Sequence, residues 1–124
     1  MALKATIGVS DDKTFEFARN LVHNHYQNWS TRIPRGIYDP VPYRLKKCQA
    51  WYSGYCYDPE YDVHYNVLQS YATPVAVYVM EDDAVYRFGT WSNTTAQHQW
   101  KFRRETGATY MIDVGSRGLY RGWR

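Results

Sequence analysis

Apolar residues at steps of three and four predict a first helix over residues 11–29. Phe15, Ala18 and Val22 follow this spacing, which is typical of a helix that buries one face against a core. Ser10 stands just before the pattern and belongs to the residue types that commonly cap a helix N-terminus. This helix is the element that the chain specifies most clearly.

A second helix is predicted over residues 94–106, because Gly107 supplies the residue type that most often ends a helix. His98 and Phe102 lie one turn apart in it and are expected to share one packed face. The imidazole is expected to pack beside Phe102 while one ring nitrogen bonds a strand carbonyl or a cap hydroxyl. A general base or metal ligand is the less favoured role, since no carboxylate or second histidine has a defined spacing to it.

The start of this second helix has more than one candidate cap. Thr94-Thr95-Ala96-Gln97 fits a capping box, in which the first threonine hydroxyl accepts from the backbone and the glutamine reaches back. Ser92 or Asn93 is the alternative cap.

Shorter alternating or apolar segments predict strands. They lie at residues 3–9, 46–56, 62–71, 74–80, 84–91 and 110–114. Short turns such as Met80–Asp83 join several of them and favour antiparallel neighbours. The predicted fold is therefore α+β, with an antiparallel sheet of about five or six strands and two helices packed on one face. Residues 1–124 are expected to form one domain, with a motif-bearing core at 51–106 and a basic tail at 115–124 whose order the sequence leaves open.

The aromatic content exceeds what one small core needs. The 124 residues include thirteen tyrosines and five tryptophans. Surplus rings are expected at the surface, where Tyr and Trp combine a large apolar area with a polar tip and often form contact surfaces. An antiparallel sheet with tyrosines on a half-exposed face explains the same excess equally well.

Charge is divided along the chain although the net charge is only +3. Residues 30–50 carry five basic side chains and one acidic, residues 51–86 six acidic and no Lys or Arg, and residues 87–124 seven basic and two acidic. This division predicts one basic and one acidic face, unless the blocks simply pair with each other. A protein that mimics DNA over its whole surface is excluded, because it would be strongly acidic.

The candidate binding residues are basic and aromatic side chains in two sets. The first set lies in the proline-rich loop and the strand after it: Arg32, Arg35, Tyr38, Tyr43, Lys46 and Lys47. The second set lies on the second helix and in the tail: Lys101, Arg103, Arg104, Arg117, Tyr120, Arg121 and Trp123. Cations hold phosphates and rings stack on bases, but the same residue types also anchor protein interfaces. The loop is also readily explained as a basic crossover from helix to sheet edge.

No catalytic or metal-binding signature stands out. The chain lacks GxSxG, P-loop, dinucleotide-binding and HExxH patterns, and no cofactor or metal is expected. Cys48 and Cys56 are expected to be reduced thiols, and the sequence does not decide whether they can pair. The first residues lack a signal-peptide pattern and no apolar run spans a membrane, so a cytoplasmic protein without a membrane partner is expected.

Two segments of the chain, which we call the motif segments, carry specific polar and aromatic residues at defined spacings. Ser70-Tyr71-Ala72-Thr73 precedes Val75-Ala76, and Trp91-Ser92-Asn93-Thr94-Thr95 precedes His98 and Phe102. This resembles a small domain common in bacteriophage and prophage genes, with the pattern SYxTxVA and then (Y/W)SxTTxxHxxxF. The structural motif residues that the resemblance singles out in the second half are Ser92, Thr94, Thr95, His98 and Phe102. The resemblance covers about half of the chain and implies a source class rather than a mechanism.

The favoured hypothesis is a non-enzymatic phage or mobile-element accessory protein that binds a host protein or ribonucleoprotein complex in the host cytoplasm. Its concrete form is steric inhibition of a nucleic-acid-targeting defence complex, as in an anti-CRISPR protein. The alternative is a phage regulator that binds nucleic acid directly. A third hypothesis is a hydrolase or nuclease centred on His98. The oligomeric state is left open.

Overall fold

A computed structural model describes residues 12–30, 43–71, 73–89 and 92–115. Within these ranges the chain forms two helices, α1 (Asp12–Ser30) and α2 (Asn93–Thr106). Both agree closely with the predicted helices at 11–29 and 94–106. The strand predicted at 3–9 lies outside the described residues.

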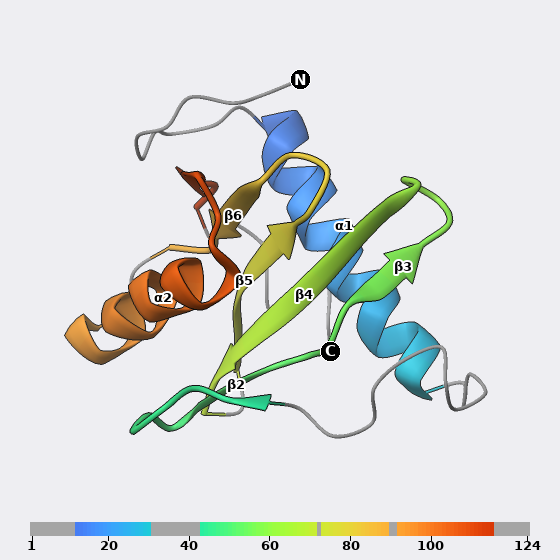
Figure 1. Ribbon diagram of the computed structural model, residues 1–124. Coiled ribbons are helices and arrows are strands. Elements are labelled where there is room, and N and C mark those ends of the chain that lie inside the picture. The colour runs from blue at the N-terminus through green and yellow to red at the C-terminus, as the bar shows by residue number, and fades with distance from the viewer. Residues whose placement is uncertain (1–11, 31–42, 72, 90–91, 116–124) are drawn as a thin grey trace.

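The described strands belong to one sheet (Figure 1). They are β1 (Tyr43–Arg44), β2 (Ala50–Tyr52), β3 (Cys56–Asp58), β4 (Val63–Ser70), β5 (Thr73–Val79), β6 (Ala84–Arg87) and β7 (Tyr110–Asp113). Their order across the sheet is β1-β2-β4-β5-β6-β7. β2 pairs with residues 68–70 of β4, and β3 pairs with residues 63–65 on the same edge of β4. The predicted α+β class with a mostly antiparallel sheet is confirmed.

The last strand pair differs from the prediction of an antiparallel sheet. β6 and β7 run parallel, with Ala84 opposite Tyr110 and Arg87 opposite Asp113. The physical reason is that α2 connects them, and a helix carries the chain back to the starting end of the sheet. The earlier pairs are joined by short turns and are antiparallel.

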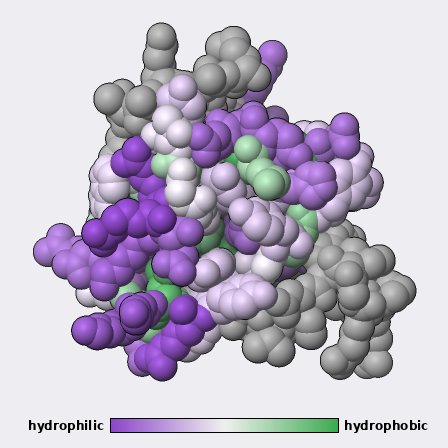
Figure 2. Space-filling model, viewed as in Figure 1, coloured by the Kyte–Doolittle hydropathy of each residue, from purple (hydrophilic) through white to green (hydrophobic). Residues whose placement is uncertain are grey.

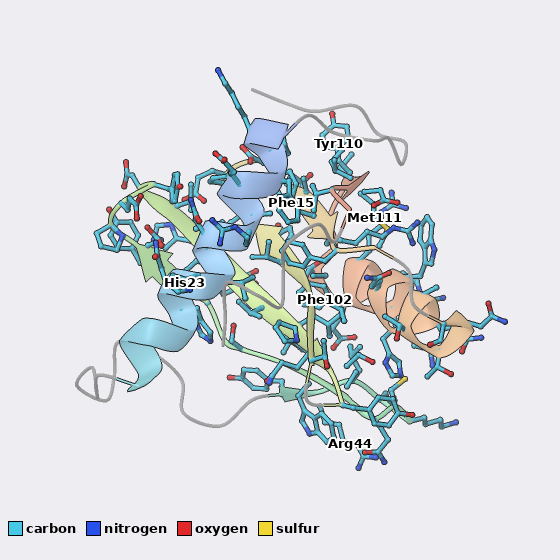
Figure 3. The ribbon with its side chains drawn as sticks, turned by 180° about the vertical axis from the view of Figure 1, so that it is seen from behind. Phe15, His23, Arg44, Phe102, Tyr110 and Met111 are labelled. Atoms are coloured by element: carbon cyan, nitrogen blue, oxygen red, sulfur yellow. The ribbon has the colours of Figure 1, made fainter. Side chains whose placement is uncertain are left out.

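The helices cover opposite faces of the sheet, so the prediction that both pack on one face is wrong. Side chains alternate between the faces along each strand. Val77 and Val79 of β5 join the apolar cluster that includes Phe15 of α1, whereas Ala76 joins the cluster that includes Phe102 of α2. Figure 1 shows β4 in front of α1, and Figure 3, turned by 180°, shows α1 in front of the strands.

The predicted strand at 46–56 is also wrong in part, because it is divided into β2 and β3. A turn precedes β2, in which Leu45 N–H bonds the Ala50 carbonyl at 2.8 Å and Lys47 has a φ of 59°. The interruption between β2 and β3 includes Ser53, whose hydroxyl accepts from Val67 N–H at 2.9 Å. The Ser53 N–H in turn donates to the Val67 carbonyl at 2.9 Å, so Ser53 continues the pairing along β4 between the two strands.

Both ends of α2 are capped by the residue types expected there. The Ser92 hydroxyl accepts from Thr95 N–H at 3.1 Å, so the alternative cap is confirmed and Thr94 is not the cap. Gly107 has a left-handed φ of 74°, and its N–H bonds the Arg103 carbonyl. A glycine suits this position because a side chain is strained at such a φ.

Candidate functional site

The two motif segments meet where α2 lies on the end of β4. The Ser70 hydroxyl lies 2.8 Å from His98 Nδ1, and both side chains are buried. Burial lowers the pKa of His98, and the ammonium of Lys101 lowers it further. The ring of Tyr71 stands 6.0 Å from that of His98. This arrangement holds the helix on the sheet with a neutral imidazole.

Gln99 makes a second polar connection between α2 and the sheet. Its Nε2 donates to the Val75 carbonyl at 2.9 Å and to the Gly89 carbonyl at 3.2 Å. Sequence reasoning missed this residue, because a buried glutamine on a helix has no signal beyond its position next to His98. Together Gln99 and His98 fix the rotation of α2 about its axis.

The turn between β1 and β2 lies beside α2. The Lys101 ammonium donates to Cys48 Sγ at 3.2 Å, and Arg44 Nε donates to the Cys48 carbonyl at 2.9 Å. Cys48 belongs to the apolar cluster on the α2 face, while Cys56 belongs to the cluster on the α1 face. The two thiols form no disulfide and are separated by the sheet.

This contact brings basic side chains of two distant segments together. We call this group the basic surface. Arg44 and Lys101 meet at Cys48, Lys46 and Lys47 lie in the same turn as Cys48, and Arg104 lies one helical turn after Lys101 on α2. Lys46, Lys47 and Arg104 are exposed. Arg103 is engaged elsewhere, since it donates to the carbonyls of Ala108 and Thr109 and lies 5.6 Å over the Trp100 ring.

Acidic side chains gather at the other end of β4 and β5. They lie in the turns before β4 and after β5: Asp58, Glu60, Asp62, Glu81, Asp82 and Asp83. Figure 2 shows hydrophilic purple over α2, over the β1–β2 turn and over these turns, with paler residues across the strands between them. Among the described residues, these acidic side chains thus lie at the end of β4 that is away from Lys46 and Lys47.

A cleft lies between the β1–β2 hairpin and the end of α2. Its volume is about 290 Å³. It is lined by Tyr43, Tyr52, Gly54, Tyr55, Asn66, Glu105 and Thr106, and we call it the tyrosine cleft. The rings of Tyr43 and Tyr52 are 5.6 Å apart and inclined by 32°.

Polar groups of the tyrosine cleft are held by specific contacts. The Tyr52 hydroxyl donates to Glu105 Oε1 at 3.2 Å, and burial together with this carboxylate raises the pKa of Tyr52. Asn66 Nδ2 donates to the Ser53 carbonyl at 2.8 Å, which fixes the orientation of the amide. The buried Asn66 Oδ1 then has no hydrogen-bond donor within the structure.

The predicted site residues are distributed as follows. Tyr43 lines the tyrosine cleft, and Lys46, Lys47, Lys101 and Arg104 belong to the basic surface. Arg103 and Arg104 also line a second hollow with Trp100. Arg32, Arg35, Tyr38, Arg117, Tyr120, Arg121 and Trp123 lie outside the described residues. Tyr52, Tyr55, Asn66 and Glu105 were missed, because only the pairing of β2 with β4 and the packing of α2 bring them together.

Two features are absent from the described residues. Among these residues, no group of three or more His, Cys, Asp or Glu side chains has a metal-binding arrangement. In the same part of the chain, neither helix combines the length and apolar character needed to cross a membrane.

Comparison with known proteins identifies a family. Residues 3–115 match the sequence profile of a family described as of unknown function, DUF8033. No curated protein and no solved structure matches the chain. The family description states neither an activity nor a source, so the resemblance to a phage domain stays a prediction. Because the match spans most of the sequence, the chain belongs to the DUF8033 family.

Proposed function

We propose that this protein is a non-enzymatic accessory protein, of phage or mobile-element type, that binds a host macromolecule. The binding region is the basic surface together with the adjoining tyrosine cleft. The partner class that fits it best is a protein or ribonucleoprotein assembly, with a nucleic-acid-targeting defence complex as the concrete case. The protein acts sterically, by covering a surface that its partner needs.

The observation that carries this proposal is the presence of exposed cations and exposed rings on the β1–β2 hairpin, on α2 and in the segment after β2. Lys46 and Lys47 are exposed in the β1–β2 turn and Arg104 on α2, while Tyr43 of β1 and Tyr55 after β2 are more than half exposed. Tyrosine and arginine are the residue types that supply most of the affinity in protein interfaces. A basic rim also speeds the approach to an acidic partner and orients it.

The burial of His98 supports a binding role over the hydrolase or nuclease hypothesis. The His98 side chain is only 3% exposed, and the Ser70 hydroxyl occupies one ring nitrogen. A general base must reach the proton that it removes, directly or through one water molecule. A histidine enclosed between helix and sheet is instead well placed to stabilise their packing.

Reversal of charge at the basic surface is expected to abolish capture of the partner. Lys46→Glu together with Arg104→Glu reverses two exposed cations on the two elements of the surface. The repulsion then opposes docking to an acidic surface and lowers the affinity by at least about tenfold. The measurement is affinity capture from a host lysate with tagged protein, read by quantitative mass spectrometry.

The matched control is Lys13→Glu together with Arg19→Glu, which makes the same change in charge on α1, on the opposite face of the sheet. It is expected to capture the same partner as the unaltered chain. Equal loss in both double variants contradicts the proposal, and so does equal capture by all three proteins.

Direct binding of nucleic acid is the second candidate, and the number of cations on the basic surface favours it specifically. If about four of them each neutralise a phosphate, the affinity falls roughly a hundredfold when salt rises from about 50 to about 200 mM. A gel-shift series with random single-stranded DNA and RNA at these two salt concentrations measures the slope. A steep slope, with capture that is lost after nuclease treatment, favours this candidate over a protein partner.

A further inference from the structure

We propose that the tyrosine cleft is a binding site for the guanidinium group of an arginine side chain supplied by a partner protein. The inference deepens the proposed function, since it names the group that the partner inserts beside the basic surface. It rests on the proposed function in one respect only, namely that a partner protein supplies the arginine. The site itself is defined by Asn66, Glu105 and the three tyrosines around them.

The first argument is the unpaired acceptor of Asn66. This residue is only 4% exposed and lines the cleft, and its amide nitrogen is committed to the Ser53 carbonyl. Among the described residues, no donor reaches its Oδ1. Buried polar atoms are almost always hydrogen-bonded in native proteins, so an exception calls for an absent donor. The ligand that completes this site must carry an N–H or O–H group.

The second argument is the carboxylate on the same cleft. Glu105, in the last turn of α2, lines the cleft, and one of its oxygens accepts from the Tyr52 hydroxyl. An amide oxygen and a carboxylate are both acceptors, so the two groups select a ligand that is rich in donors and positively charged. A guanidinium group has five N–H donors in a planar fork and pairs with carboxylates in two-point contacts.

The third argument is the wall of the cleft. Tyr43, Tyr52 and Tyr55 supply three aromatic rings, and cations are attracted to the faces of such rings. Arginine stacks on aromatic rings through its flat group, which a lysine ammonium cannot do. The volume of about 290 Å³ is at the lower end for ligand pockets, which suits one inserted side chain.

The carboxylate also argues against a nucleobase as the ligand. A base that stacks between tyrosines brings its phosphate close to the cleft, where Glu105 repels it. The positive charge of arginine is attracted at the same position. Because the Asn66 Oδ1 atom is itself buried, its donor enters with a small movement of the lining rings, of which Tyr55 is the most exposed at 56%.

The test is a titration of the full chain with N-acetyl-L-arginine methylamide, followed by ¹H–¹⁵N NMR. We expect a dissociation constant on the order of 1–10 mM, as is reasonable for one side chain. The largest shifts are expected at the Asn66 side-chain amide and at the backbone of residues 52–55 and 105–106. Blocked norleucine, which has no charged group, is expected to leave these signals unchanged.

Two variants test the assigned contacts. Glu105→Gln removes the charge with almost no change of shape and is expected to weaken arginine binding about tenfold or more. Tyr55→Ala is expected to weaken it about threefold. Asn66→Leu removes the acceptor, but it also breaks the bond to Ser53, so Glu105→Gln is the decisive variant in case the leucine variant does not fold.

The controls have the same chemistry outside the cleft. Glu16→Gln changes an exposed glutamate on α1, and Tyr71→Ala removes a tyrosine that is as exposed as Tyr55. Both are expected to bind arginine like the unaltered chain. Absence of shifts at the cleft, equal binding of norleucine, tighter binding of cytidine, or binding that Glu105→Gln leaves unchanged each overturns the proposal.

The outcome is separable from that of the proposed function. If arginine fails to bind while affinity capture still recovers a partner that depends on the basic surface, only the inference about the cleft is wrong. If arginine binds with the expected dependence on Glu105 while no partner is captured, the cleft stands and the proposed function is wrong.

Discussion

Replacement of Phe102 by alanine is expected to lower the free energy of unfolding by about 3–5 kcal/mol. The Phe102 side chain is fully buried in the apolar cluster between α2 and the sheet, with its ring 5.6 Å from that of Tyr52. Deletion of a buried aromatic ring removes its transfer free energy and leaves a cavity that the surrounding side chains fill only in part. Chemical denaturation in urea measures the effect.

Trp100→Ala is the matched control, because it removes a larger ring from the same helix. Trp100 is 39% exposed and Arg103 lies over its ring. This variant is expected to change the free energy of unfolding by less than about 1 kcal/mol. Similar losses in the two variants indicate that α2 does not pack on the sheet through Phe102.

Acidification from pH 6.5 to pH 4 is expected to cost about 3 kcal/mol of stability through His25 alone. Burial lowers the pKa of His25 from 6.5 to about 4. The folded protein keeps this imidazole neutral while the unfolded chain binds a proton below pH 6.5. The stabilisation that the neutral His25 contributes is therefore complete above pH 6.5, the pKa in the unfolded chain. It is lost as the pH falls toward about 4, the pKa in the folded protein. The pKa of His98 is also lowered, so protonation of this residue likewise reduces the free energy of unfolding as the pH falls.

Urea unfolding at several values between pH 4 and pH 7 measures this dependence. His25→Gln is the comparison, since glutamine does not titrate and its amide keeps a polar group near the Tyr65 hydroxyl, which lies 3.2 Å from His25 Nδ1. The pH dependence is expected to be clearly shallower in the variant. Identical pH profiles in the two proteins exclude His25 as the titrating group.

The sequence predicts the two helices of the fold well. The positions of Phe15, Ala18 and Val22 depend on local periodicity, and all three are buried against the sheet. The end of α2 at Gly107 likewise follows from a residue type with a local conformational reason. Such features need no knowledge of distant contacts, which explains why they were predicted to within one residue.

The placement of the helices on the two faces was wrong, although residues 74–79 contain a signal for it. This segment is a nearly continuous apolar run, Pro-Val-Ala-Val-Tyr-Val, in which every residue is buried. A strand that is buried on both faces shows such a run instead of a clean alternation. An apolar layer must therefore cover each side of β5, which excludes two helices on one face.

The tyrosine cleft was predicted only in part, for a physical reason. Tyr43 was a candidate through its neighbours in the sequence, whereas Asn66 and Glu105 are brought to it by strand pairing and helix packing. Neither residue type is unusual at its own position. The register of β2 against β4, in which Tyr52 lies opposite Leu68, is a long-range property that local patterns do not specify.

The sequence predicts one basic and one acidic face. In the described part of the chain, Lys46 and Lys47 lie at one end of the long strands and the acidic turns lie at the other. This follows from the turns, since those around β4 and β5 at one end are acidic and the β1–β2 turn at the other carries Lys46 and Lys47. The exposed ring of Tyr43 belongs to the same β1–β2 hairpin as these two lysines.

Site-specific photocrosslinking is the most direct test that this end of the molecule binds a macromolecule. A benzophenone amino acid replaces Tyr55 or Tyr43 in turn, and Glu16 on α1 in the control, followed by irradiation in host lysate. The account predicts that positions 55 and 43 give the same crosslinked product and that position 16 gives none. A product from position 16 alone, or no product from positions 55 and 43, contradicts it.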